Sequence, residues 1–155
     1  MSGGAERLEV LMISVGTRAC AIPLHQVSET MRPLPIEPVA GTPRFVRGVS
    51  VVRGAPIPVI DLRALLENSD VSSSYGRFVS IKLDDRRVAL AVDEVIGVTT
   101  LDKSKLPELP PLLRDVATDT IETLGTRDAQ LLLLLRAARI VPDAVWTTLA
   151  LAASP

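Results

Sequence analysis

Few side chains in this sequence could serve as catalytic groups. His25 is the one most mechanisms would need, because it is the chain's single histidine. A Ser-His-Asp arrangement would have to use it, yet the sequence holds no Gly-x-Ser-x-Gly turn for the nucleophile. A metal site would need further ligands, and neither a second histidine nor a cysteine stands at a suitable spacing. We therefore expect His25 to begin a surface helix, without a catalytic or metal-binding role.

The acidic pairs Asp84-Asp85 and Asp93-Glu94 are the next candidates for acid–base chemistry. A glycosidase needs two facing carboxylates in a cleft, usually with aromatic side chains for sugar stacking, and aromatic residues make up only 3% of this chain. The pairs fall at an expected turn and after an expected strand, where solvated carboxylates are ordinary. The glycine-containing stretch RGVSVVRG lacks both Walker and dinucleotide-binding spacing. We expect no enzymatic activity and no cofactor.

The single cysteine, Cys20, lies in the segment Ala-Cys-Ala-Ile, which is typical of a buried small hydrophobic residue rather than a reactive thiol. One cysteine can form no disulfide within the chain, which suits a reducing compartment. The N-terminal MSGGAERLEV shows no signal peptide, and the longest aliphatic run, Leu131–Leu135, is far shorter than the roughly 20 residues of a spanning helix. We expect a cytoplasmic protein with no direct membrane insertion.

The charge distribution leaves one nucleic-acid hypothesis open. The first half is rich in arginine, whereas the region from Asp84 to Asp128 has an acidic excess, although the net charge is only −1. Single-strand binders built on small barrels combine a basic groove with stacking aromatics, and the four aromatics here are scattered. A small-barrel nucleic-acid binder is therefore a remote alternative. Two oppositely charged halves fit a protein with two partners, and ordinary surface charge explains them equally well. The aromatic residues are Phe45, Tyr75, Phe78 and Trp146.

The elements that would position these residues come from an internal repeat. Met12–Val27 aligns without a gap over Ser80–Val95, each copy reading apolar run, polar turn, apolar run. The turns Gly16-Thr17 and Asp84-Asp85 predict β-hairpins. A Pro-punctuated stretch and a further apolar segment that runs into Leu-Arg-Ala follow each copy. We expect two similar β units, each too small to be stable alone, that share one interior. The apolar segments are Pro58–Leu62 and Leu131–Leu135.

Helices are expected to be few. His25–Arg32 is one candidate, which Pro33 would stop. Asp61 could cap a short helical turn that follows it, and Pro142–Leu151 has the opening Pro and Asp of a terminal helix. The polar stretch Glu67–Gly76 is the best linker between the repeats. Because apolar residues make up 47% of the chain, a core can form, and the prediction is a mainly β fold of two small barrels.

The stretch Val46–Leu66 places charges beside apolar β-formers. Val49–Val52 predicts a strand with Gly48 and Gly54 allowing tight backbone turns at its ends. The next strand begins at Ala55, and Pro56 and Pro58 within it indicate an edge or a turn. Arg53 needs an anionic or carbonyl partner if it is partly buried, and Glu29 is such a partner.

The sequence GVSVVRGAPIPVIDLRALL resembles the signature of the CheW-like family, the chemotaxis coupling proteins, which runs Gly-Val-Ile-Asn-Leu-Arg-Gly and then a Pro-Val-Ile-Asp-Leu type strand. AIPLHQVSETMR is similar to the family's segment before its first Pro-rich loop, and GTPRFVRG to its Pro-x-Phe-x-x-Gly approach. ALAVDEVIGV is similar to its Val-Asp-x-Val motif. Together these landmarks cover nearly the whole chain, from Leu8 to about Leu151.

This resemblance implies a fold and a function. It implies a single CheW-like domain over residues 8–152, after a tail at 1–7, built of two intertwined five-stranded β-barrel subdomains with a few short helices. It implies a non-enzymatic adaptor that couples the cytoplasmic tips of methyl-accepting chemoreceptors to a CheA-type histidine kinase in signalling arrays. No cofactor, metal or nucleic acid is implied. A rival within the fold is an accessory or inhibitory protein that binds only one of these partners in a pilus, motility or developmental pathway.

The resemblance also implies which residues form a receptor groove. Val27 and Glu29 match positions of receptor contact, and Arg53 is the arginine of the Leu-Arg-Gly element, shaped by the two flanking glycines. One departure stands out, because the family's Ile-Asn-Leu reads Ser-Val-Val here and Val51 replaces the usual Asn. The groove residues implied in this way are Val27, Glu29, Gly48, Val51, Arg53 and Gly54.

Overall fold

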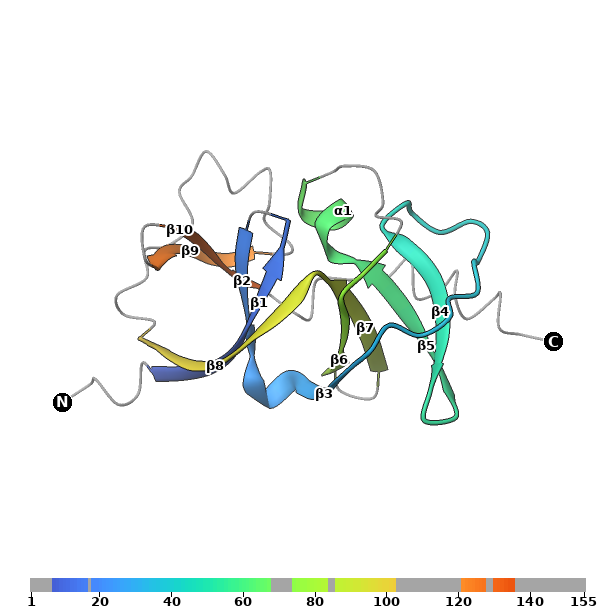
Figure 1. Ribbon diagram of the computed structural model, residues 1–155, viewed down its shortest axis with the longest axis horizontal. Coiled ribbons are helices and arrows are strands. Elements are labelled where there is room, and N and C mark those ends of the chain that lie inside the picture. Colours follow the sequence, from blue (N-terminus) through green and yellow to red (C-terminus); the bar gives the residue numbers. More distant parts are fainter. Residues whose placement is uncertain are drawn as a thin grey trace. The chain divides into compact units, whose positions relative to one another are not determined.

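The computed structural model describes residues 7–16, 18–67, 74–83 and 86–102, together with the backbone strands 121–127 and 130–135. These residues form two five-stranded sheets, which belong to two compact units (Figure 1). Within the described ranges, the first unit takes residues 7–27 and 93–135, and the second takes residues 28–92.

The first sheet has the strand order β8-β1-β2-β10-β9. Its pairs are antiparallel except for β10 and β2, which run parallel with Leu132–Leu134 beside Ala19–Ala21. The core of this unit includes the fully buried Val10 and Ala21 and the nearly buried Met12. Its strands are β1 (Arg7–Val15), β2 (Arg18–Pro23), β8 (Glu94–Asp102), β9 (Ile121–Arg127) and β10 (Gln130–Leu135).

The second sheet has the order β3-β6-β7-β5-β4 and a helix, α1 (Leu62–Glu67), that follows β5. Here β5 and β7 run parallel, with Val59–Asp61 beside Ala89–Ala91. Phe78 and Val59 are completely buried in its core, where Met31 packs against them from β3. The strands are β3 (Val27–Met31), β4 (Val46–Val52), β5 (Ala55–Asp61), β6 (Arg77–Leu83) and β7 (Arg86–Val92).

The internal repeat predicted from the sequence corresponds to equivalent pieces of the two sheets. The hairpins β1–β2 and β6–β7 are the two predicted hairpins, and each receives one parallel strand on its second member, β10 or β5. The strand after each hairpin joins the other sheet: β3 pairs within the second and β8 within the first. This exchange confirms the expected mainly β fold of two intertwined five-stranded halves, although no pair among the described strands closes either sheet into a full barrel.

The helix predictions had mixed outcomes. The helix expected over His25–Arg32 is wrong, because Leu24–Gln26 form only a single 3₁₀ turn and β3 begins at Val27. The segment alternates half-buried and exposed residues with a period of two, which suits a half-buried strand rather than a helix. The short helix after Asp61 is confirmed as α1, with Asp61 Oδ1 accepting a hydrogen bond from the Ala64 backbone N–H at 2.9 Å. The predicted helix Pro142–Leu151 lies outside the described residues.

The β4–β5 hairpin explains why its strand tolerates two prolines. Its loop is the pair Arg53-Gly54, with positive φ at both residues (50° and 81°), the pattern of a type I′ turn. In such a hairpin, facing residues alternate between hydrogen-bonded and non-hydrogen-bonded pairs, starting with a hydrogen-bonded pair beside the loop. Pro56 and Pro58 therefore belong to non-hydrogen-bonded pairs, where no N–H is needed to bond β4. The strand β5 is not an edge strand, as the prolines had indicated, but its pairing with β7 begins only at Val59.

Candidate partner-binding groove

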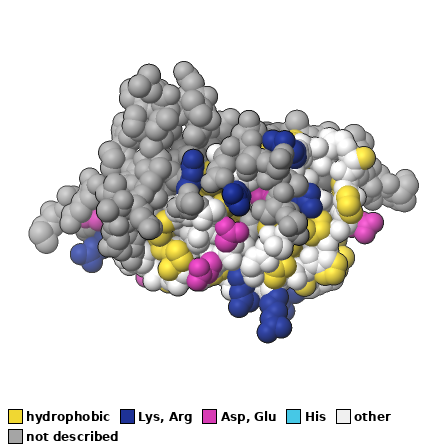
Figure 2. Space-filling view, turned by 45° about the horizontal axis from the view of Figure 1, so that its top comes forward, with side chains coloured by type: hydrophobic (Ala, Val, Ile, Leu, Met, Phe, Trp, Pro, Cys, Tyr) yellow, Lys and Arg dark blue, Asp and Glu magenta, His cyan; other side chains and the backbone are white. Residues whose placement is uncertain are grey.

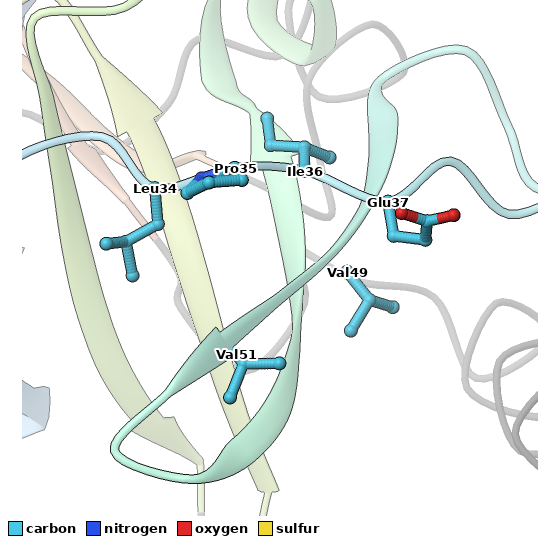
Figure 3. Close-up of a pocket in the computed structure, with 6 residues that line it drawn as sticks. All are labelled: Leu34, Pro35, Ile36, Glu37, Val49 and Val51. Carbon is cyan, nitrogen blue, oxygen red and sulfur yellow. The ribbon is translucent and has the colours of Figure 1, made fainter.

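A groove of about 340 Å³ opens beside β4 in the second unit. Figure 3 shows its six lining residues, contributed by the segment 34–37, which runs across β4, and by β4 itself. All but one are aliphatic or proline, and the exception is an exposed glutamate. The lining residues are Leu34, Pro35, Ile36, Glu37, Val49 and Val51.

Backbone hydrogen bonds hold the segment 34–37 against β4. Glu37 N–H donates to the Val49 carbonyl and Val49 N–H donates to the Glu37 carbonyl, both at 2.8 Å. The Ser50 hydroxyl donates to the Pro35 carbonyl at 2.7 Å. Leu34 and Ile36 also pack against the core of the unit. The groove wall is therefore held in place before any partner arrives, and the backbone groups of Glu37 and Val49 are already bonded to each other.

Gly48 makes this close approach possible. The structure places it inside β4, at a shift in register between Val46 and Gly48, and not at the end of the strand as we expected. Its φ is +139°, and a Cβ at this position would overlap the Glu37 carbonyl group and come within 2.9 Å of the Pro38 Cα. Only glycine fits both the backbone conformation and the space. The structure thus gives Gly48 a steric role, which is to admit the segment 34–37 beside β4, while its part in receptor binding stays a prediction.

Val51 is the most exposed large hydrophobic residue among those described, with 67% of its surface open to solvent. It is one of the residues that line the groove, and its part in receptor binding stays a prediction. In the space-filling view of Figure 2, hydrophobic side chains reach the surface between acidic and basic ones. Val27 opens β3 and is half-buried, but it is not among the residues that line this groove. Its participation in partner binding stays a prediction.

Arg53 and Glu29 are brought together as expected. Arg53 Nε donates to Glu29 Oε1 and its terminal nitrogen donates to Oε2, each at 2.8 Å. This planar, two-point geometry is the strongest form of an arginine–carboxylate contact. The hydrogen bonds from Arg53 lower the pKa of Glu29, and the contact with Glu29 raises the pKa of Arg53. Gly54 follows in the same turn and completes the hairpin loop.

Asp61 and Tyr75 form a second polar cluster, which the sequence did not predict. Asp61 is fully buried, and its Oδ2 accepts a hydrogen bond from the Tyr75 hydroxyl at 2.9 Å while Oδ1 caps α1. Burial raises the pKa of Tyr75, and the hydrogen bond to the carboxylate of Asp61 raises it further. The cluster ties the segment that leads into β6 to the start of α1. We assign it a structural role.

The crossing segment was also missed. It belongs to the first of the two Pro-punctuated stretches, Pro33–Pro43, for which the sequence predicted no defined structure. The available signal was the placing of the aliphatic residues Leu34 and Ile36 two positions apart, since residues at that spacing in an extended chain share one face. This signal did not indicate what the face packs against, because Glu37 and Val49 are distant in the sequence and only folding brings them together.

The described residues hold neither a metal site nor a membrane-spanning helix. Within the described part of the chain, no group of three or more His, Cys, Asp or Glu side chains is arranged to hold a metal ion. Over the same part, no helix is long and apolar enough to cross a membrane.

Comparison with known proteins decides the family. The model of the CheW-like domain matches residues 9–145. The chain belongs to the CheW-like family. This is a family of chemotaxis scaffold and adaptor proteins.

The chain is 27% identical over 136 residues to the chemotaxis protein CheW of Klebsiella aerogenes, covering 87% of this chain and 82% of that one. It is also 27% identical over 140 residues to the protein FrzA of Myxococcus xanthus, with 84% and 87% covered.

A solved structure agrees with the CheW-like fold. The crystal structure of the scaffolding protein TtCheW from Thermoanaerobacter tengcongensis superposes with a TM-score of 0.75, covering 89% of this chain and 94% of that one at 20% identity. The two intertwined sheets described above are therefore the CheW-like fold, and the family resemblance carried by the β4–β5 motif is confirmed.

Proposed function

We propose that this chain is a non-enzymatic, cytoplasmic chemosensory adaptor that couples the cytoplasmic tips of chemoreceptors to a CheA-type histidine kinase. The observation that carries this proposal is the preformed apolar groove beside β4, with Val51 exposed in it, in a chain of the CheW-like family. An exposed apolar groove without a ligating or nucleophilic cluster suits recognition of another protein.

The receptor would bind at the surface implied by the family resemblance. Its apolar parts supply burial, while the Arg53–Glu29 pair fixes the orientation of the hairpin loop and the charge that a partner meets. A separate surface would bind the kinase. The residues proposed for the receptor surface are Val27, Glu29, Gly48, Val51, Arg53 and Gly54.

An adaptor of this kind works by raising effective concentration. Two modest contacts on one body hold receptor and kinase together, and the second contact becomes intramolecular once the first has formed. No cofactor, metal or nucleic acid takes part in this mechanism.

Reconstitution tests the proposal. Receptor tip fragments and the kinase are combined with and without this chain, and co-sedimentation and kinase autophosphorylation are followed. Co-assembly and a change in kinase activity are expected only when the chain is present. Equal activity and equal assembly in both mixtures would overturn the adaptor function. Binding of one partner alone would instead show the accessory role.

Substitution at Val27 separates the two contacts. Val27→Asp should weaken association with the receptor, because a charge would be placed in a half-buried apolar contact, and should leave kinase association largely intact. Ser28→Asp is the matched control, since Ser28 is the exposed neighbour on the same strand. Loss of both associations in Val27→Asp would point to unfolding, which circular dichroism of the variant detects.

A further inference from the structure

We infer that the groove beside β4 is selective for a receptor helix that presents an aliphatic side chain to Val51 and a lysine or arginine to Glu37, and that Val51 sets this preference. This inference rests on the proposed receptor-coupling function. It adds the chemistry of the partner segment and names the residue that determines specificity.

The apolar lining is the first reason. Val51 contributes the most exposed aliphatic side chain, and Leu34 and Val49 line the same groove (Figure 3). A partner that placed an amide or a hydroxyl against them would lose water without gaining a hydrogen bond, whereas an aliphatic side chain gains burial on both sides. The groove volume lies at the lower end of the range for small binding pockets, about 300–1,000 Å³, which suits a few anchor side chains.

The backbone around the groove argues for a helix rather than an added strand. Strand addition needs unpaired N–H and C=O groups along an edge. On β4 the N–H and C=O of Val49 are bonded to Glu37, and Pro35, which has no N–H, uses its carbonyl for the Ser50 hydroxyl. An extended partner could therefore not pair with Val49, and this interrupts a continuous ladder along β4. A helix needs only side-chain contacts in the groove, and it brings neighbouring anchors to one face at intervals of three and four residues.

The charge at the rim supplies the second recognition element. Glu37 is exposed, and both of its backbone groups are bonded to Val49, so the position of its carboxylate relative to the groove is restricted. It makes no ion pair with another residue in the described ranges. A cation beside the aliphatic anchor would meet this carboxylate, and it would favour one orientation of the helix over the other.

Val51→Asn tests the specificity. We expect association with a receptor tip fragment to weaken roughly tenfold or more, because the new amide would be desolvated against aliphatic groups. Val51→Ile should keep binding within about threefold, since it preserves the apolar surface. Val98→Asn is the matched control. It makes the same change at a valine on β8 that is also exposed, 59%, and lies outside the groove. Calorimetric titration of the full chain with the tip fragment measures each affinity.

A charge exchange tests the second element. Glu37→Lys should weaken the same association several-fold, and replacing one lysine or arginine of the tip fragment by glutamate should restore it for this variant alone. Unchanged or tighter binding by Val51→Asn, or failure of every exchange to restore Glu37→Lys, would overturn the inference while wild-type binding upholds the adaptor function. If the wild-type chain binds no tip fragment, the proposed function falls and this inference with it.

Discussion

Arg53 bonds Glu29 across the second unit, although their elements lie at opposite ends of its sheet order. Glu29 belongs to the edge strand β3, and Arg53 lies in the loop that ends the other edge strand, β4. Two hydrogen bonds of 2.8 Å require these edges to approach, so the sheet curls toward closure at the hairpin tip. This curvature is what the expected barrel requires, although the strand pairs themselves do not close.

The Arg53–Glu29 pair should show measurable coupling. The single changes Glu29→Ala and Arg53→Ala and the double change should be non-additive in urea denaturation, because each single change removes the same contact. The coupling should be small and should shrink in high salt, since 73% of the Arg53 side chain is exposed and the pair is less shielded than we expected from the sequence. Additive effects at low salt would contradict the prediction.

The pH dependence of stability follows from the same pair. Arg53 lowers the pKa of Glu29 in the folded chain below the value of 4.5 taken for an unperturbed glutamate. The pair therefore contributes fully at neutral pH, and its contribution is lost as the pH falls below about 4.5 and through the folded-state value. Glu29→Gln should lack this part of the acid dependence. Identical pH profiles for the variant and the wild type, between pH 3 and 6, would exclude it.

Gly48 should be intolerant of any side chain. Gly48→Ala should lower the free energy of unfolding by about 2–4 kcal/mol, because it adds both a collision with the Glu37 carbonyl and an unfavourable φ. Gly54→Ala is the control, since its φ of +81° is also unfavourable but nothing lies within 4 Å of the added Cβ. It should cost only about 1–2 kcal/mol. Equal losses in chemical denaturation would show that space at Gly48 is not the determinant.

Tyr75 can be titrated without interference, because it is the chain's single tyrosine. Ultraviolet difference titration of the folded chain should give a midpoint above the ordinary value of 10.0, since burial and the Asp61 hydrogen bond both raise the pKa of Tyr75. The stabilising contribution is present below pH 10 and is lost as the pH rises through the folded-state value. In Asp61→Asn the midpoint should fall but stay above 10.0, because burial remains. An unshifted wild-type midpoint would refute the cluster.

Tyr75→Phe measures the stability that the same hydrogen bond provides. We expect a loss of about 1–3 kcal/mol in the free energy of unfolding at pH 7, because a buried carboxylate oxygen loses its hydroxyl donor. The ring contact with Phe78, at 6.3 Å between centroids, would be kept in this variant. A loss well below this range would mean that Asp61 has a sufficient set of other partners.

Asp93 should protect a turn far away in the sequence. Its Oδ2 accepts a hydrogen bond from the Gly16 N–H at 2.6 Å, and its own N–H donates to the Ser14 carbonyl at 3.0 Å. Asp93→Ala should speed hydrogen exchange at the Gly16 amide by about fivefold, because one bond of about 1 kcal/mol is removed. Glu94→Ala is the control, since this neighbouring carboxylate is exposed. Equal exchange in the two variants would contradict the role of Asp93.

Where local pattern and tertiary structure agree, the sequence was sufficient. The hairpins of the repeat were predicted because their alternating runs and polar turns act within a few residues. The capping role of Asp61 follows from a contact only three residues away. The helix prediction at His25–Arg32 failed because Val27–Met31 pair with β6, and this pairing gives them a strand conformation. The pairing is a tertiary contact, so the local sequence carried no signal for it.

The sequence by itself thus determined the family and the mainly β composition, since these depend on residue types and their local order. Charge complementarity alone suggested the pair Arg53–Glu29, whose members are 24 residues apart. Only the tertiary structure decided that Glu37 bridges to Val49, that Gly48 leaves room for this crossing, and that Val51 is exposed in the resulting groove. The physical reason is that the groove wall is made by backbone hydrogen bonds between segments separated by a long loop. Any residue except proline can both donate and accept such bonds, so they leave no mark in the order of the side chains.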